Sequence, residues 1–320
     1  MMNRVVRAVF AAAVVVGCCS ASADIPASAY VQTGLVAQWD GIDNAGTGTH
    51  QADATAWKDI STAAKGGDLT LAAKEAFGDN CLTITTAGTH VTGDLGLSSM
   101  TLEFVLKRTS GSTGIRRWDD PVGTTSFESW STDNEGLLER IGSTRQLTVK
   151  PVNGTMYTLA TRYTNGGEHR FQAAANGAIT KGKTTNNATV IGNYNIPSTI
   201  QLLKNTANLE VYAVRIYDRE LTDDELMRNA ALDRMRFEDA TMDETGYRYN
   251  ADESRVEVCV SVDMIGADTS RVRVNEGEAG TTAVAWANLG DTVAMSVLPG
   301  ADETFVCWKS ADIDLGGAAT

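Results

Sequence analysis

Proline, histidine and cysteine are scarce in this 320-residue chain, and each shortage excludes a class of protein. The five prolines form no Ser/Pro-rich tract, which excludes a long extended linker. The three histidines, His50, His90 and His169, show no His-x-x-x-His spacing and no cysteine partner, which excludes a recognisable zinc site. We expect each of them to be an ordinary surface or strand histidine.

The five cysteines are too few for a disulfide scaffold. Cys18 and Cys19 lie in an N-terminal segment that we expect to be removed. Cys81 stands in an alternating apolar stretch, which predicts a buried free thiol. Cys259 and Cys307 share the C-terminal part of the chain, and the sequence leaves open whether they pair.

The N-terminal apolar run is too short for a membrane span. Ala8–Val16 is about half of the roughly 20 residues that a spanning helix needs. Arg4 and Arg7 precede it and Ala21–Ala23 follows it, which is the pattern of a cleaved signal peptide. We therefore predict that residues 1–23 are a signal peptide and that the protein is exported, either secreted or held at the cell surface.

A second interpretation of the same segment is lipid attachment. Val15–Cys18 has the form of a bacterial lipobox, in which the cysteine is lipidated. Lipidation of Cys18 would anchor the exported protein to a membrane, and the sequence does not decide between the two routes.

Positive charge is also in deficit, because 27 Lys and Arg oppose 40 Asp and Glu, for a net charge of −13. Such a chain repels phosphate backbones, so nucleic acid is not expected as a partner. The acidity is typical of a soluble extracellular protein, and cation binding is the alternative that it leaves open.

One segment has the pattern of a helix. Thr222 and Glu225 form a capping box, and Leu221 and Leu226 flank it at the spacing of a hydrophobic staple. Acidic residues in the first turn and arginines near the end complement the helix dipole. These signals predict a helix over about 223–237, with inward-facing side chains at Leu226, Ala230, Met227 and Phe237.

The rest of the chain has the pattern of short strands and turns. Strands are expected at 34–40, 100–107, 146–150 and 169–173, and Asn176-Gly177 is a hairpin turn signal. The segment 209–217 is apolar on both faces, which indicates a strand covered on both sides. We predict an all-β fold: an antiparallel jelly-roll β-sandwich over 24–240 with one short C-terminal helix.

A composition shift near residues 238–250 marks a second module. Beyond it, Arg255–Asp263 alternates with valine at every second position, and shorter strands are expected near 271–275, 290–298 and 304–308. We predict a small β module over 246–320. The Gly- and Ala-rich residues 316–320 follow its last strand without a closing strand, so we expect the module to be incomplete.

The first and last parts of the predicted sandwich resemble the opening and closing segments of a known domain family. Residues 34–44, Trp57–Ser61 and Asp68–Leu71 are similar to the opening strands of laminin-G-like domains of bacterial surface proteins, and Val211–Leu226 is similar to their closing segment. The resemblance implies the concanavalin A-like lectin/glucanase fold, whose members bind glycans or proteins and sometimes calcium. More weakly, residues 290–297 and 305–308 resemble the small β repeats of internalin-type surface proteins.

Catalytic patterns are missing. Retaining glycosidases need two carboxyl groups about 5–5.5 Å apart, and the Glu-x-Asp-x-x-Glu pattern of the related glucanases does not occur. Glu103 lies on a suitable strand without acidic neighbours, and Asp133 and Glu135 lie in a loop-like stretch. No Gly-x-Ser-x-Gly elbow and no phosphate-binding glycine loop occurs either. A glycoside hydrolase is therefore the alternative function, not the leading one.

Two groups of residues are candidate binding sites. Asp40, Asp43 and Asn44 bring oxygen donors to one loop, which suits calcium, although an ordinary turn has the same composition. Exposed aromatic rings with polar neighbours are typical of glycan sites, and the residues that fit this description in loop-like surroundings are Arg117, Trp118, Asp119, Asp120 and Trp130. A structural role for the two tryptophans is the alternative, and Trp39 and Trp57 are expected in the core.

The sequence thus predicts an exported, non-catalytic protein that binds carbohydrate or an extracellular protein and requires no cofactor, with calcium as a candidate ligand. A structural or adhesive spacer is the remaining alternative. This scaffold supports all of these roles, so the fold alone does not decide among them.

Overall fold

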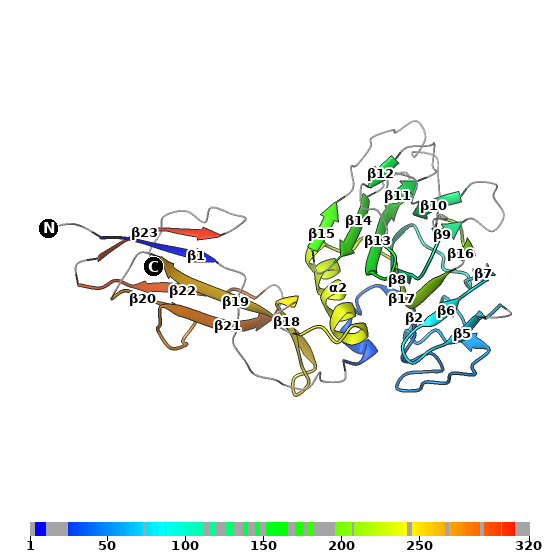
Figure 1. The fold of residues 1–320 in the computed structure, drawn as a ribbon, viewed down its shortest axis with the longest axis horizontal. Coiled ribbons are helices and arrows are strands. Elements are labelled where there is room, and N and C mark those ends of the chain that lie inside the picture. The colour runs from blue at the N-terminus through cyan, green and yellow to red at the C-terminus, as the bar shows by residue number, and fades with distance from the viewer. Residues whose placement is uncertain are drawn as a thin grey trace. The chain divides into compact units, whose positions relative to one another are not determined.

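The computed structural model divides the chain into two compact units, shown in Figure 1. One unit, here called the sandwich unit, comprises Pro26–Glu238, and the other, here called the terminal unit, comprises Met1–Ile25 with Asp239–Thr320. The structure describes residues 4–10, 25–72, 75–86, 88–111, 115–119, 126–130, 137–139, 145–147, 152–165, 170–175, 178–181, 196–206, 208–241, 245–265, 269–288, 291–301 and 303–310, and several of these strands by their backbone alone.

Two antiparallel sheets form the sandwich unit. The larger has eight strands in the order β15-β14-β13-β8-β17-β6-β5, with β2 also paired to β17. Its strands are β2 (Leu35–Asp40), β5 (Glu75–Phe77), β6 (Leu82–Ile84), β8 (Ser99–Arg108), β13 (Met156–Thr164), β14 (Arg170–Ala175), β15 (Ala178–Lys181) and β17 (Leu209–Tyr217).

The smaller sheet has six strands in the order β12-β11-β10-β9-β16-β7. They are β7 (Gly88–Val91), β9 (Ile115–Asp119), β10 (Ser126–Trp130), β11 (Leu137–Glu139), β12 (Arg145–Leu147) and β16 (Gln201–Thr206), and the short pair β3 (Ala56–Trp57) and β4 (Leu69–Thr70) stands apart. The fold class is therefore the predicted one, an all-β antiparallel sandwich.

The core lies between the sheets. Buried side chains from both sheets and from β3 meet there, and they include Trp39, Trp57, Phe104, Leu202 and Ile216. Both tryptophans are in the core, as predicted. Burial of this apolar surface is the main favourable term in folding, at about 25 cal/mol per Å² removed from water.

The opening and closing segments of the family-like region lie side by side. β2 pairs with β17, with Trp39 opposite Val214 and Ala37 opposite Ile216. Every residue of β17 but one is buried, which confirms the predicted strand with two covered faces. β14 and β15 pair with Ala175 opposite Ala178, the register that a two-residue hairpin connection requires.

The helix α2 spans Asp223–Phe237, as predicted. The Thr222 hydroxyl accepts a hydrogen bond from the Glu225 amide, and the Glu225 carboxylate accepts one from the Thr222 amide. Leu221 and Leu226 are buried in one cluster, which confirms the staple. Of the predicted inward-facing residues, Met227 is only partly buried. A short 3-10 turn, η1 (Ala27–Ala29), precedes β2.

The terminal unit is also built of strands. Its main sheet has the order β18-β19-β1-β23, with β21 paired to β19, and β20 pairs with β22. The strands are β1 (Arg4–Phe10), β18 (Tyr247–Asn250), β19 (Arg255–Ile265), β20 (Arg271–Val274), β21 (Thr282–Asn288), β22 (Met295–Leu298) and β23 (Glu303–Ser310). β1, β18 and β21 were not predicted as strands from the sequence, and β1 lies within the predicted signal peptide.

Candidate functional site

The predicted aromatic site falls on the smaller sheet. Arg117, Trp118 and Asp119 belong to β9 and Trp130 to β10, so the prediction that they lie in loops is wrong. This polar stretch has the composition of a loop but forms two of the six strands of the sheet. A strand can be polar because only one of its two faces has to pack against the core. Only the backbone of these strands is described, and Asp120 lies outside the described residues.

The backbone register assigns Trp118 to the inner row of this sheet. Trp118 stands opposite Leu202 of β16, and Leu202 stands opposite His90 of β7. Leu202 and His90 are both buried, and Leu202 belongs to the core. Trp118 also stands opposite Glu128, and Trp130 lies two residues further along β10. This register favours the structural role that the sequence left open for Trp118. Trp130 stands opposite Ile115 beyond a register shift, so the register does not assign it to the inner row, and the role of both tryptophans in binding stays a prediction.

The neighbouring row faces the other side of the sheet. Asp119 stands opposite Gln201, which stands opposite Val91, and Ser126 of β10 continues the row beyond Asp119. Val91 is 48% exposed and Gln201 is partly exposed, so this row lies on the outer face. We call Val91, Gln201, Asp119 and Ser126 the outer row. The sequence analysis found Asp119 but missed Gln201, because strand pairing is needed to align them.

The outer face of the larger sheet is closed by α2. Arg215 of β17 and Glu103 of β8 are opposite each other in the register, and the Arg215 Nε donates to a Glu103 carboxylate oxygen at 2.7 Å. The two terminal nitrogens of Arg215 donate to the carboxylate of Asp233 on α2, at 2.9 and 2.7 Å. All three side chains are fully buried. A bidentate ion pair therefore joins the helix to the sheet.

Neutral groups complete this buried polar network. The Asn229 amide nitrogen donates to Glu103 at 3.0 Å and to the Tyr217 hydroxyl at 3.0 Å. The Thr158 hydroxyl donates to Asp233 at 2.8 Å, and the Tyr30 ring lies 4.1 Å from the Arg215 guanidinium. Glu103 is thus a structural residue, with no access to a substrate.

The network contains two carboxylates and one guanidinium. Burial raises the pKa of Glu103, although Arg215 acts in the opposite direction. Burial alone would lower the pKa of Arg215, but the carboxylates of Asp233 and Glu103 outweigh it and raise that pKa. Arg215 is therefore charged.

The predicted calcium loop holds a guanidinium. One oxygen of Asp40 accepts hydrogen bonds from two backbone amides and lies 3.0 Å from a terminal nitrogen of Arg236, and the Asp43 carboxylate lies 3.3 Å from the same nitrogen. The Asn44 amide group bonds the backbone of Gln51 in both directions. Arg236 already supplies positive charge to the loop. Calcium binding there stays a prediction, and among the described residues no group of three His, Cys, Asp or Glu is arranged for a metal ion.

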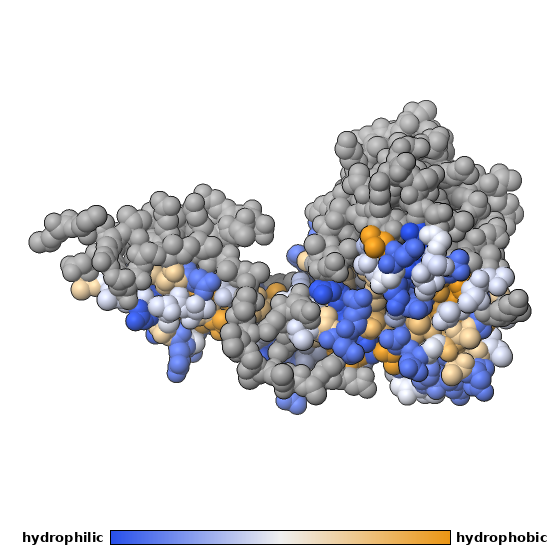
Figure 2. Space-filling model, viewed as in Figure 1, coloured by the Kyte–Doolittle hydropathy of each residue, from blue (hydrophilic) through white to orange (hydrophobic). Residues whose placement is uncertain are grey.

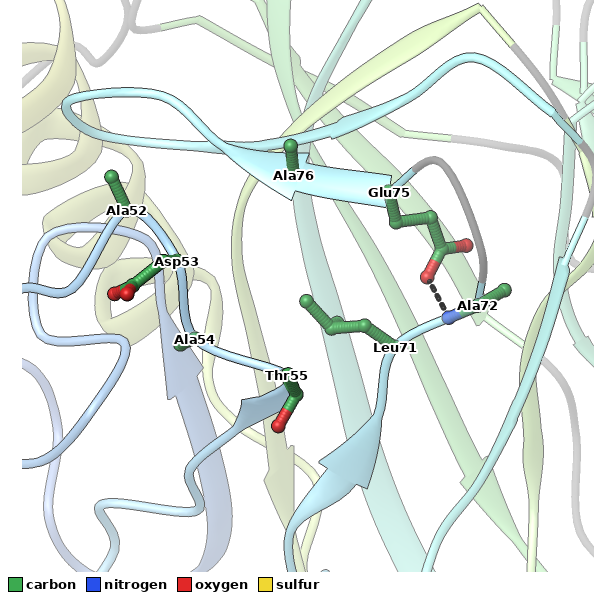
Figure 3. Close-up of a pocket in the computed structure, with 8 residues that line it drawn as sticks. All are labelled: Ala52, Asp53, Ala54, Thr55, Leu71, Ala72, Glu75 and Ala76. Atoms are coloured by element: carbon green, nitrogen blue, oxygen red, sulfur yellow. Dashed lines mark hydrogen bonds between the residues drawn. The ribbon is translucent and has the colours of Figure 1, made fainter.

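A pocket of about 400 Å³ opens between the β3–β4 pair and β5 (Figure 3). Alanines and short polar side chains line it: Ala52, Asp53, Ala54, Thr55, Leu71, Ala72, Glu75 and Ala76. One Glu75 oxygen accepts a hydrogen bond from the Ala72 amide at 2.7 Å, drawn in Figure 3. Only Asp53 offers a charged, exposed group to the opening. The pocket is therefore weakly equipped to orient a ligand.

Behind the pocket, Glu75 meets His90. The second Glu75 oxygen lies 3.3 Å from Nε2 of His90, and both side chains are buried. Nδ1 of His90 lies 3.1 Å from the Thr70 carbonyl oxygen, which can only accept, so Nδ1 carries a proton. The pair connects β5 to β7 and faces the interior, so we assign it to packing between the two sheets.

The remaining sequence candidates are placed as follows. Cys81 is a buried free thiol, as predicted, and burial raises its pKa to about 11. The side chain of Cys307 is not described, and β1 lies between β19 and β23 in the sheet, so pairing of Cys259 with Cys307 stays open. Asp133 and Glu135 lie outside the described residues. Among the residues described, no helix is long and apolar enough to cross a membrane.

No protein-family model matches the chain, and no curated protein matches its sequence. Among solved structures, the chain is similar to Trypanosoma rangeli sialidase in complex with sialic acid, with 15% identity and a TM-score of 0.47 over 66% of this chain and 34% of the sialidase. It is also similar to the receptor-binding domain of botulinum neurotoxin C/D mosaic serotype, with 10% identity and a TM-score of 0.43 over 63% of this chain and 52% of that one.

The chain thus spans about a third of the sialidase and about half of the toxin domain. At these scores the likenesses carry no argument about activity or ligand. The two solved structures are β-rich, and the sandwich of this chain is established by its own sheets, described above. The laminin-G and internalin resemblances stay proposals.

Proposed function

We propose that this chain is an exported, non-catalytic carbohydrate-binding protein of laminin-G-like type. Its ligand would lie on the outer face of the smaller sheet, over the outer row. The observation that carries the proposal is that α2 covers the outer face of the larger sheet, where the buried polar network attaches it. That face is therefore not open to a ligand. The inner faces are filled by the core.

The chemistry of the outer row suits a sugar. Asp119 carries a carboxylate, Ser126 a hydroxyl and Gln201 an amide whose oxygen is buried and whose nitrogen can donate, and such groups bind sugar hydroxyls through hydrogen bonds. Val91, exposed at the end of the row, offers apolar contact to a sugar ring. Arg117 of β9 and Trp130 of β10 belong to the same two strands as this row and, with Asp120, remain part of the proposed ligand surface, whereas the register of Trp118 favours a structural role.

Two further observations support binding without catalysis at the cell exterior. Glu103 lies on the strand where a related glucanase would carry its catalytic acids. Its carboxylate accepts hydrogen bonds from Arg215 and Asn229. The described surface in the view of Figure 2 is largely hydrophilic, and hydrophobic residues appear in small separate groups. The signal-like residues 1–23 support export, with cleavage before Asp24 or lipidation of Cys18 as the two routes.

The test is a glycan array probed with the full chain, followed by titration of any hit. Asp119→Ala and Gln201→Ala should each weaken binding at least about tenfold, since each removes hydrogen bonds to the ligand. Asp224→Ala, an exposed change on α2, is the matched control and should leave binding unchanged. Loss of binding in Asp53→Ala with full binding in Asp119→Ala would move the site to the pocket.

Two other results would replace the proposal. Silence on a broad array would favour a structural or adhesive spacer, or a protein partner. Release of reducing sugar from polysaccharides, abolished by substitution of Asp133 or Glu135, would show a glycoside hydrolase instead.

A further inference from the structure

The first strand of the chain occupies a central position in the terminal unit. β1 pairs antiparallel with β19, with Arg7 opposite Ile265 and Val9 opposite Asp263. On its other side it pairs in parallel with β23 along its whole length, from Arg4 opposite Glu303 to Phe10 opposite Ser310. β1 therefore uses backbone groups on both of its edges.

Other pairs hold β19, but β23 depends on β1. β19 also pairs with β18 and with β21, the latter from Glu257 to Asp263. Within the described part of the chain, the sheet reaches β23 only through β1. Removal of residues 4–10 would leave β19 folded against its other neighbours and would free one edge each of β19 and β23.

The same residues form the n-region and the apolar run of the proposed signal peptide, so this step rests on the proposed export. A signal peptidase that cuts before Asp24 removes β1. The freed edges of β19 and β23 then carry unpaired N–H and C=O groups, and such edges are templates for an added strand that would join them again.

We propose that the position between β19 and β23 is a strand-acceptor site in the exported protein, filled by an extended strand of another polypeptide. That strand runs antiparallel to β19 and parallel to β23, as β1 does. The sequence of β1, RVVRAVF, defines the chemistry of the occupant: proline-free and rich in valine and other apolar residues.

The parallel pairing favours a separate polypeptide. A strand joined directly to the end of β23 by a tight turn would run antiparallel to it, because parallel neighbours need a crossover of a dozen or more residues. The segment that follows β23 therefore does not fill the site by a simple hairpin.

The probe is a fluorescent peptide with the sequence of residues 3–11, added to the processed protein isolated after export. Saturable binding is expected from its anisotropy. The same peptide with Val6→Pro and Ala8→Pro should bind at least about tenfold more weakly, because each proline removes a backbone donor. Unprocessed full chain, whose site holds β1, should bind the peptide far more weakly than the processed form.

Two variants of Ile265 test whether the peptide binds at the edge of β19. Ile265→Pro removes a backbone donor beside β1 while leaving the β19–β21 pairs at 257–263, and it should weaken peptide binding. Ile265→Ala keeps the backbone N–H and should bind like the unmodified protein. Circular dichroism checks that both variants keep their β-structure.

Absence of binding to folded, processed protein, or equal binding of the proline peptide, would overturn the acceptor site. Mass spectrometry of the exported protein tests the processing separately. If residues 1–23 are retained, the export proposal fails in its cleaved form and β1 is a permanent strand. If they are removed and the peptide does not bind, the acceptor site alone fails.

Discussion

Substitution of Arg215 by methionine would leave two carboxylates buried without their cation. Arg215 makes three charge-assisted hydrogen bonds of 2.7–2.9 Å, one to Glu103 and two to Asp233. Breaking a buried ion pair by removing one partner costs about 3–5 kcal/mol. We therefore expect Arg215→Met to lower the free energy of unfolding by about 4 kcal/mol and Tm by roughly 10 °C, for a unit of this size.

Urea unfolding followed by tryptophan fluorescence measures this loss, because Trp39 and Trp57 lie in the core of the same unit. Lys65→Met removes a positive charge from an exposed position and is the matched control, with an expected change within about 0.5 kcal/mol. A loss below about 1 kcal/mol for Arg215→Met at pH 7 would refute the assignment of Arg215 as the ion that holds α2 on the sheet.

The pH dependence provides a second check. Burial already raises the folded-state pKa of Glu103, and Arg215 opposes that rise. Without Arg215 the pKa of Glu103 rises further, so the folded variant takes up a proton that the unfolded chain, with its ordinary glutamate pKa, does not hold. A raised acid pKa stabilises the fold at low pH. The deficit of Arg215→Met should therefore shrink between pH 7 and pH 5, and a constant deficit would contradict the argument.

Three further predictions concern other contacts. Arg236→Met should cost about 3 kcal/mol in urea unfolding, because it leaves Asp40 and Asp43 without their cation; millimolar calcium should not raise Tm, and a clear rise would support a metal site in that loop. Thr222→Ala should cost about 1 kcal/mol through loss of the helix cap, whereas Thr222→Ser should be nearly neutral in the same assay. The thiol of Cys81, with a pKa near 11, should react with a disulfide reagent at pH 8 at least about tenfold more slowly in folded than in unfolded protein, and equal rates would mean that it is accessible.

Local signals in the sequence were sufficient for the helix. Thr222, Glu225 and the flanking leucines are contiguous, so their mutual contacts follow from helix geometry alone. The apolar pattern of 209–217 likewise predicts a covered strand without knowledge of its neighbours. These features were therefore predicted with their boundaries.

Features that depend on pairing between distant segments were not predictable in this way. β9 and β10 contain adjacent polar residues, Arg116-Arg117 and Glu128-Ser129, that interrupt the apolar/polar alternation of a strand, and they were therefore interpreted as loops. The acidic loop was a candidate calcium site, with an ordinary turn as the alternative, and its ion-pair partner Arg236 was not predicted because it lies 196 residues away in the sequence.

The buried polar network did leave a trace in the sequence. Arg215 lies between Val214 and Ile216 of β17, and Glu103 lies between Leu102 and Phe104 of β8. A lone charge flanked by core residues on a covered strand indicates a partner of opposite sign. The identity of that partner on α2 requires the three-dimensional structure.

The attachment of α2 has a mechanical consequence. The chain passes from this helix, which ends at Phe237, into the C-terminal part of the terminal unit, which begins at Asp239. Tension applied through this C-terminal part therefore reaches α2 before any strand of the sandwich. Ion pairs and short hydrogen bonds are directional and lose most of their strength with a small displacement. The helix should accordingly resist pulling without gradual sliding and then detach in one step, so that detachment of α2 sets the force at which the sandwich begins to open.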